Sequence, residues 1–225
     1  MKDIIILGAG GLGQEVVWLV EEIHDTRKEW NILGYLDSHP SVKNMTLINY
    51  PVLGPFEDAC KYPEAFFIVA FGDPRMREQV VNLVSTFKIK WATLISPTVR
   101  LHPSNKLGEG VVIGRYTDLT LDCTIGNHAM LNIHVVLGHK VELGDYSIVS
   151  PNVTLNGGAK IGRSCSIGAN AFVRDVTVGD YVTIGASSCV IKPIESDCVV
   201  AGVPATVIRK GAPVHSVTKI LREQS

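Results

Sequence analysis

The feature that most constrains this fold is a branched apolar residue that returns every six positions in the second part of the chain. Ile, Leu or Val fills fourteen consecutive places of the series, at 95, 101, 107, 113, 119, 125, 131, 137, 143, 149, 155, 161, 167 and 173. A usually small or branched residue follows four positions later, and Asn105 is the exception. One residue is then lost, and the phase resumes at Val178.

A period of six matches neither an α-helix nor a hairpin meander. Each block supplies a short strand and a bend, and three blocks close one coil whose neighbours stack at the strand spacing of about 4.8 Å. The branched residue points inward and the small residue leaves room beside it. We therefore predict a parallel β-helix over residues 94–208, with Cys123 and Cys165 at small inward positions.

The first part of the chain follows a different pattern, in which short apolar strands alternate with amphipathic helices. Strands are predicted at 3–8, 31–37 and 65–72, and helices at 14–25 and 76–87. This alternation indicates a parallel sheet with helices on its faces, so residues 1–93 are predicted to form a Rossmann-like α/β domain.

The first strand of this domain ends in a glycine-rich turn. Gly8, Gly10 and Gly13 have the spacing GxGxxG, and Asp37 closes the second predicted strand. Alone, this pattern predicts a dinucleotide at a helix N-terminus with Asp37 on a ribose hydroxyl. The domain is too short for both halves of an NAD site. In "FGDPRMRE", Asp73 and Arg75 lie at a strand end, where two interpretations stay open: contact with the ligand or, as the favoured one, a helix cap and a surface charge.

Composition argues against several classes of partner. The formal net charge is −1 with no basic run, which disfavours nucleic acid and anionic membranes as partners. Apolar runs such as "FFIVAF" are too short to cross a bilayer. The five cysteines form no CxxC pair, which favours a reducing cytoplasm. No metal site is expected, because His134 and His139 fall in successive blocks and should point from different faces.

The repeats, the closing "VVAGVPATVIRK" and the preceding "GAGGLGQEV" resemble the hexapeptide-repeat sugar O- and N-acyltransferases, which include sialic-acid O-acetyltransferase-like and nucleotide-aminosugar N-acetyltransferase proteins. This resemblance implies a left-handed β-helix and a cytoplasmic homotrimer in bacterial surface glycan biosynthesis. It also implies acetyl-CoA between neighbouring subunits, a nucleotide-linked amino sugar on the N-terminal domain, and a histidine as general base.

The histidine that matches the family's catalytic position is His139, in "VVLGHKVELGD". Residues eighteen apart stack, so His139 should lie between Leu121 and Gly157. We expect Gly157 and Gly158 to leave space beside the imidazole for a pantetheine arm. An imidazole can take the proton that an amine or a hydroxyl loses as it attacks a thioester at neutral pH, so direct transfer is expected.

The chain departs from the family directly after this histidine. Lys140 stands where the family usually has an acid that orients the base and raises its basicity. A cation there disfavours the protonated imidazole. Asp122 lies eighteen residues before Lys140, and we hypothesise that it pairs with Lys140 or turns toward His139.

The resemblance also assigns binding residues. It implies acceptor contacts at Gly10, Gly11, Leu12, Asp37, Ser38, Gly72 and Asn132, and acetyl-CoA contacts at Gly157, Ala169 and Ala186. A family histidine is replaced by Leu12. The leading hypothesis is acetylation of the amino group of a nucleotide-linked sugar, while a sugar O-acyltransferase, a longer acyl group, a small NAD-dependent oxidoreductase or an inactive scaffold remains open. Residues 209–225 are expected to form a C-terminal tail, either a short helix or disordered.

Overall fold

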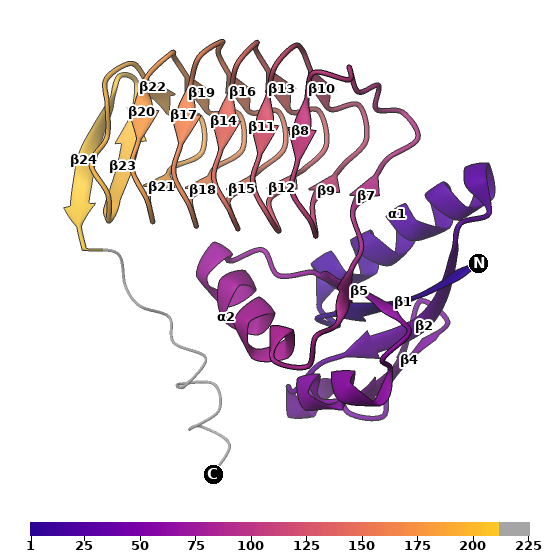
Figure 1. Cartoon of the computed structure of the whole chain (residues 1–225). Helices are drawn as coiled ribbons and strands as arrows, with labels where there is room; N and C mark the ends of the chain where they lie inside the picture. Colours follow the sequence, from indigo (N-terminus) through magenta and orange to yellow (C-terminus); the bar gives the residue numbers. More distant parts are fainter. Residues whose placement is uncertain (212–225) are drawn as a thin grey trace.

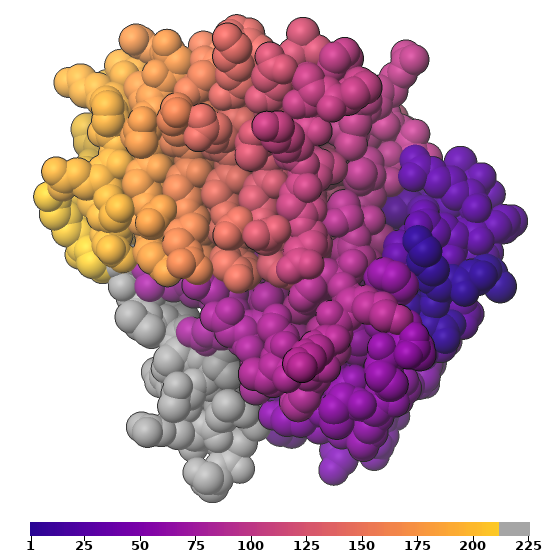
Figure 2. All heavy atoms as spheres, in the orientation of Figure 1, coloured from indigo at the N-terminus to yellow at the C-terminus, as the bar shows by residue number. Residues whose placement is uncertain are grey.

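The computed structural model describes residues 1–211, and most of the expected tail lies outside this range. The chain forms two domains, a long stack of coils and an N-terminal α/β domain that packs along one flank of this stack (Figure 1). The space-filling view shows the N-terminal domain in continuous contact with that stack (Figure 2). The predicted combination of an α/β domain and a left-handed parallel β-helix is confirmed.

The N-terminal domain is a six-stranded sheet in the order β3-β4-β2-β1-β5-β6, in which only β3 and β4 pair antiparallel. Its strands are β1 (Lys2–Leu7), β2 (Trp30–Leu36), β3 (Thr46–Leu47), β4 (Tyr50–Gly54), β5 (Phe66–Val69) and β6 (Lys90–Trp91), and its helices are α1 (Gly11–Arg27), α2 (Pro74–Ser85) and the 3-10 helices η1 (Pro40–Val42) and η2 (Phe56–Lys61). The sequence pattern missed β3, β4 and β6; of these, β3 and β6 have only two residues and show no periodicity.

Alternation along β1 divides the core of this domain. Ile4 and Ile6 pack on the α1 side, while Ile5 and Leu7 pack on the side of α2 and η2. The glycine turn that follows has a local reason, because a Cβ at Gly13 would lie 2.0 Å from the Gly8 carbonyl oxygen. The GxGxxG spacing therefore lets α1 begin directly against the strand end.

The β-helix has three sheets. We name one after the N-terminal domain that packs on it, and the other two after the outward side chains that distinguish them. The domain-side face holds β7 (Leu94–Ile95), β9 (Val112–Ile113), β12 (Met130–Leu131), β15 (Ile148–Val149), β18 (Ser166–Ile167), β21 (Thr183–Ile184), β23 (Cys198–Gly202) and β24 (Ala205–Lys210). The apolar face holds β10 (Asp118–Leu119), β13 (Val136–Leu137), β16 (Thr154–Leu155), β19 (Phe172–Val173) and β22 (Cys189–Val190). The charged face holds β8 (Lys106–Leu107), β11 (Thr124–Ile125), β14 (Glu142–Leu143), β17 (Lys160–Ile161) and β20 (Thr177–Val178).

The pairing register reproduces the sequence period. Partners lie eighteen residues apart, as for Met130 with Ile148, and the interval falls to seventeen after the lost residue, as for Lys160 with Thr177. Cys123 and Cys165 are fully buried at small inward positions, as predicted. Asn105, the exception in the pattern, receives the Cys123 amide on its Oδ1 atom and donates its Nδ2 to the Thr120 carbonyl.

The turns between the faces share one backbone conformation. The third residue after an inward branched residue adopts a left-handed conformation, with φ of 60° at Asp122, 57° at His134 and 60° at Lys140. Lys140 is therefore the turn residue of its block, which accounts for its backbone position and leaves its side chain exposed.

An apolar cluster joins the two domains. Outward side chains of Val112, Met130 and Ile148 are buried in the same apolar cluster as the α1 residues. Arg77 of α2 is fully buried there, where its Nε donates to the His128 carbonyl at 2.5 Å and its Nη1 donates to the Phe71 carbonyl at 3.2 Å. Burial lowers the pKa of Arg77 to about 9. This arginine fixes the loop after β5 against the β-helix.

Candidate functional site

A cavity of about 470 Å³ opens at the carboxyl end of the parallel strands, beside the glycine turn. We call it the glycine-turn pocket. Six of the seven positions predicted for the acceptor line it together: Gly10, Gly11, Leu12, Asp37, Ser38 and Gly72. Such a crevice outside the strand ends of an open α/β sheet is where ligands bind in this architecture.

The backbone of the glycine turn is open toward this pocket. A Cβ at Gly10 or Gly11 would meet no atom within 4 Å, and α1 begins without a side-chain cap. The first amides of α1 are therefore free to donate to a bound anion, which the helix dipole also favours.

Asp37 makes two backbone contacts, and the ribose contact that the dinucleotide pattern predicts stays a prediction. Its Oδ2 accepts from the Ala9 amide at 2.8 Å, and its Oδ1 accepts from the His39 amide at 2.8 Å. Both carboxylate oxygens thus hold the backbone that surrounds the pocket. Ser38 accepts from the Phe56 amide at 3.2 Å and braces the same rim.

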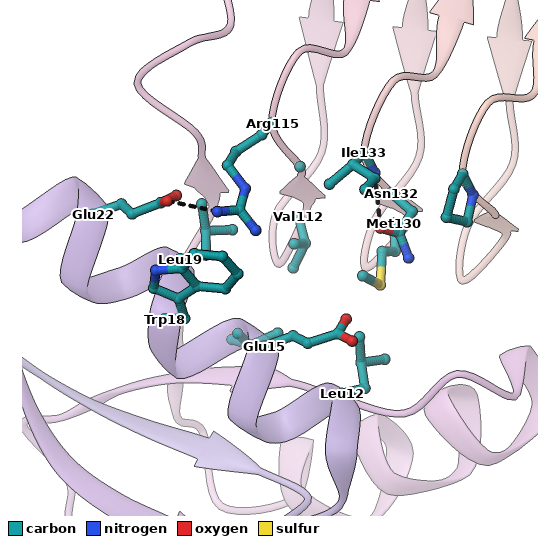
Figure 3. Close-up of a pocket in the computed structure, with 13 residues that line it drawn as sticks. Leu12, Glu15, Trp18, Leu19, Glu22, Val112, Arg115, Met130, Asn132 and Ile133 are labelled. Carbon is teal, nitrogen blue, oxygen red and sulfur yellow. Dashed lines mark hydrogen bonds and ion pairs between the residues drawn. The ribbon is translucent and has the colours of Figure 1, made fainter. Parts of the chain in front are cut away.

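A second cavity, of about 320 Å³, lies between α1 and the coils (Figure 3). We call it the helix–coil pocket. Asn132, the seventh predicted acceptor residue, lines it from the β-helix, and Leu12 lines both cavities. The Asn132 Oδ1 accepts from the Ile133 amide at 2.7 Å, so its Nδ2 remains available as a donor. The two pockets therefore meet at Leu12.

His139 lies in the turn after β13, at the corner between the apolar and charged faces, and its side chain is exposed. A Cβ added at Gly157 would lie 2.8 Å from both Nε2 and Cε1 of the imidazole. This position corrects the expectation of an open gap at Gly157. The glycine does lack a side chain, but the imidazole ring of His139 occupies the space that a side chain at Gly157 would take. Within residues 1–211 the imidazole has no hydrogen-bond partner.

The hypothesised acid partner is not found among residues 1–211. Among the described residues, no hydrogen bond or ion pair joins Asp122 to Lys140 or His139. The Asp122 amide donates to Ser104 Oγ at 3.0 Å, which fixes the turn instead. Stacking in register places two turn residues one above the other, but it does not make their side chains meet.

The residues predicted to contact acetyl-CoA divide between two corners of the β-helix. Gly157 shares the corner of His139, whereas Ala169 and Ala186 follow β18 and β21 at the corner between the domain-side and apolar faces. Asn132 lies at this second corner, on an earlier coil. The fold of this chain therefore does not bring His139 together with Ala169, Ala186 and the two pockets.

Sequence reasoning missed part of the helix–coil pocket. Glu15, Trp18 and Glu22 line it from α1, and Arg115 lines it from the β-helix. Their helical spacing of three to four residues, continuing from Leu12, was the signal that could have identified this face of α1.

Other predicted residues have structural contacts. Asp73 caps α2 as predicted, since its Oδ1 accepts from the Arg75 and Met76 amides at 2.9 Å. Arg75 also makes an ion pair with Asp197 at 3.3 Å. His134 is exposed and stacks on Tyr116.

Residues 1–211 contain no group of three or more His, Cys, Asp or Glu side chains placed to hold a metal ion. No helix in this range is long and apolar enough to span a bilayer.

Comparison with known families matches both domains separately. Residues 3–84 match the PglD N-terminal domain, and residues 122–157 match the bacterial transferase hexapeptide repeats. Among curated proteins, a serine acetyltransferase of Synechococcus elongatus is 33% identical over 126 residues, which cover 52% of this chain and 45% of that protein. The matches span less than half the length of the first such relatives.

Solved structures match nearly the whole chain. A mutant of perosamine N-acetyltransferase from Caulobacter crescentus, in complex with CoA and GDP-perosamine, superposes with a TM-score of 0.86 at 24% identity, covering 93% of this chain and 98% of that one. The acetyltransferase domain of PglB from Neisseria gonorrhoeae, in complex with acetyl coenzyme A, gives 0.70 at 26% identity, covering 92% and 99%. This chain therefore carries a PglD-type N-terminal domain followed by transferase hexapeptide repeats, and it is similar to the acetyltransferases that combine these two parts.

Proposed function

We propose that this protein transfers an acetyl group from acetyl-CoA to the amino group of a nucleotide-linked amino sugar, with His139 as general base. The observation that carries the proposal is the meeting of two pockets at Leu12, one beside free helix amides and one against the β-helix. The first suits a diphosphate and the second suits the attached sugar. Relatives that bind CoA and GDP-perosamine, or acetyl coenzyme A, support this assignment.

The proposal requires an assembly, because His139 and the pockets lie at different corners of one protomer. The apolar face between those corners carries exposed outward side chains at Val136 and Phe172, whose exposed fractions are 41% and 36%. The charged face instead presents Lys106, Glu142 and Lys160. Burial of the apolar face between copies would bring one copy's His139 toward its neighbour's second corner.

Symmetry sets the height at which these corners meet. In a closed trimer whose three-fold axis is parallel to the β-helix axis, equivalent residues of every copy lie at one level. His139 and Asn132 are only seven positions apart in sequence, within one eighteen-residue coil. Their levels then differ by less than one coil rise of about 4.8 Å. A homotrimer would thus place the base of one subunit beside the helix–coil pocket of the next.

The chemistry uses an unpartnered imidazole. The sugar amine attacks the thioester carbonyl, a C–N bond forms, and the amine's proton passes to a ring nitrogen of His139. The C–S bond then breaks, and CoA leaves as a thiol carrying that proton. Because the imidazole of His139 makes no hydrogen bond within the described residues, its ring nitrogens are available to the acceptor.

The test is acetyl-CoA with a panel of UDP-, dTDP- and GDP-linked amino sugars, with thiol release as readout. We expect one of them to be acetylated. His139→Asn should lower kcat by at least about a hundredfold while light scattering still reports a trimer. Unchanged turnover would remove His139 from the mechanism. Absence of transfer to every acceptor would instead favour a scaffold protein, for which Lys140 in place of an acid is the best argument.

Acetylation of a hydroxyl is the second candidate. It is favoured by the relatives that match the β-helix, which include a serine acetyltransferase and a galactoside O-acetyltransferase of Escherichia coli. Hydroxyl counterparts of each amino sugar in the panel separate the two chemistries directly.

A further inference from the structure

Three charged side chains line the helix–coil pocket, and two of them neutralise each other. Arg115 donates from Nη1 to the Glu22 carboxylate at 2.8 Å, and its guanidinium lies 3.6 Å from the centre of the Trp18 ring. Both contacts hold the arginine at one end of the cavity, away from Leu12 (Figure 3). The positive charge of Arg115 is therefore already paired with the carboxylate of Glu22.

The third charge is unbalanced. Glu15 has no hydrogen bond and no ion pair within residues 1–211. Figure 3 shows its carboxylate turned toward the β-helix side of the pocket, between Leu12 and Met130. The helix–coil pocket therefore carries one net negative charge, on the exposed Glu15, next to apolar walls and beside Leu12, which also lines the glycine-turn pocket.

A glutamate near the start of a helix is also favoured by the helix dipole alone. That effect explains the residue type, but it does not explain why the side chain faces a cavity. The Asn132 amide adds an unused donor on the opposite wall. Together they offer an anionic acceptor and a neutral donor, which suits a ring that carries one cationic group and hydroxyl groups.

From these contacts we propose that Glu15 binds the protonated amine of the acceptor sugar and so selects amino sugars over hydroxyl sugars. This inference rests on the proposed function and specifies its acceptor. Glu15 acts in binding, and the amine releases its extra proton to solvent before His139 takes the second one during attack. A hydroxyl in the same place would leave the carboxylate without its cation.

The experiment compares two ligands with two proteins. The ligands are the amino-sugar nucleotide with the highest turnover in the panel and the same nucleotide sugar with a hydroxyl in place of the amine. Glu15→Gln should weaken binding of the amine, measured as KM and by calorimetry, about tenfold, because the hydrogen bond loses its charge. Binding of the hydroxyl ligand should change less than twofold. The amine effect should also shrink above the pH at which the free amine deprotonates.

Glu109→Gln is the matched control, since Glu109 is exposed at another corner of the β-helix and lines neither pocket. It should leave both ligands unaffected. If Glu15→Gln changes both ligands equally, or neither, while acetyl transfer to the amine persists, the role of Glu15 is refuted and the proposed function stands. If the wild-type protein acetylates only the hydroxyl ligand, or no member of the panel, the proposed function fails as well.

Discussion

Replacing Gly157 by alanine tests whether the position of His139 matters. Its φ lies outside the left-handed range, so alanine fits the backbone. The new Cβ would lie 2.8 Å from the imidazole Nε2, whereas ordinary contacts begin at 3.4 Å. The ring must therefore move by about 0.6 Å or turn away, and misplacement of a reacting group by about 1 Å can cost a hundredfold in rate. We expect Gly157→Ala to lower kcat about 10- to 100-fold.

The matched control is the next residue. Gly158 has a φ of +83°, and a Cβ there would meet only Asp175, at 3.8 Å. Gly158→Ala should lower the free energy of unfolding by about 1–2 kcal/mol through backbone strain. Because its Cβ meets no imidazole atom, it should lower kcat less than Gly157→Ala does. Steady-state kinetics, denaturant titration and the NMR shifts of the His139 ring measure these effects. A Gly157→Ala protein with kcat within twofold of the wild type and an unmoved ring signal would refute the reasoning.

Three further outcomes follow from the described contacts. Burial, and secondarily the charge of Arg77, lowers the pKa of His128 to about 4, so the unfolded chain binds more protons than the folded one between pH 6.5 and 4. The free energy of unfolding should therefore fall by up to about 3 kcal/mol as the pH drops through that window, and His128→Asn should flatten this slope in urea titrations; parallel slopes would contradict it. Phe172→Asp should convert the proposed trimer to monomers in light scattering and abolish transfer, whereas an intact trimer would place the interface elsewhere. Asp122→Asn should leave kcat and its pH profile within twofold of the wild type, and a shifted profile would restore Asp122 as a partner of His139.

The sequence determined most of the fold because its constraints are local. Each block of six carries its own inward residue, small neighbour and left-handed turn residue, so Leu137, Gly138 and Val141 could be placed without knowledge of any distant contact. The same holds for the glycine turn at Gly8, where the helix must begin against the strand. Strands of two residues outside the repeat, such as β6, carry no such period and were missed.

The candidate site depended on tertiary packing. Only the folded chain shows that the His139 ring occupies the space beside Gly157. Likewise, only the folded chain shows that both carboxylate oxygens of Asp37 accept hydrogen bonds from backbone amides. Only the tertiary structure places the unpaired carboxylate of Glu15 in the pocket between α1 and the β-helix. The physical reason is that a repeat fixes which residues stack along each corner, but not which way their side chains turn. The corner that the N-terminal domain covers is decided by burial between segments distant in sequence, as for Arg77 and His128.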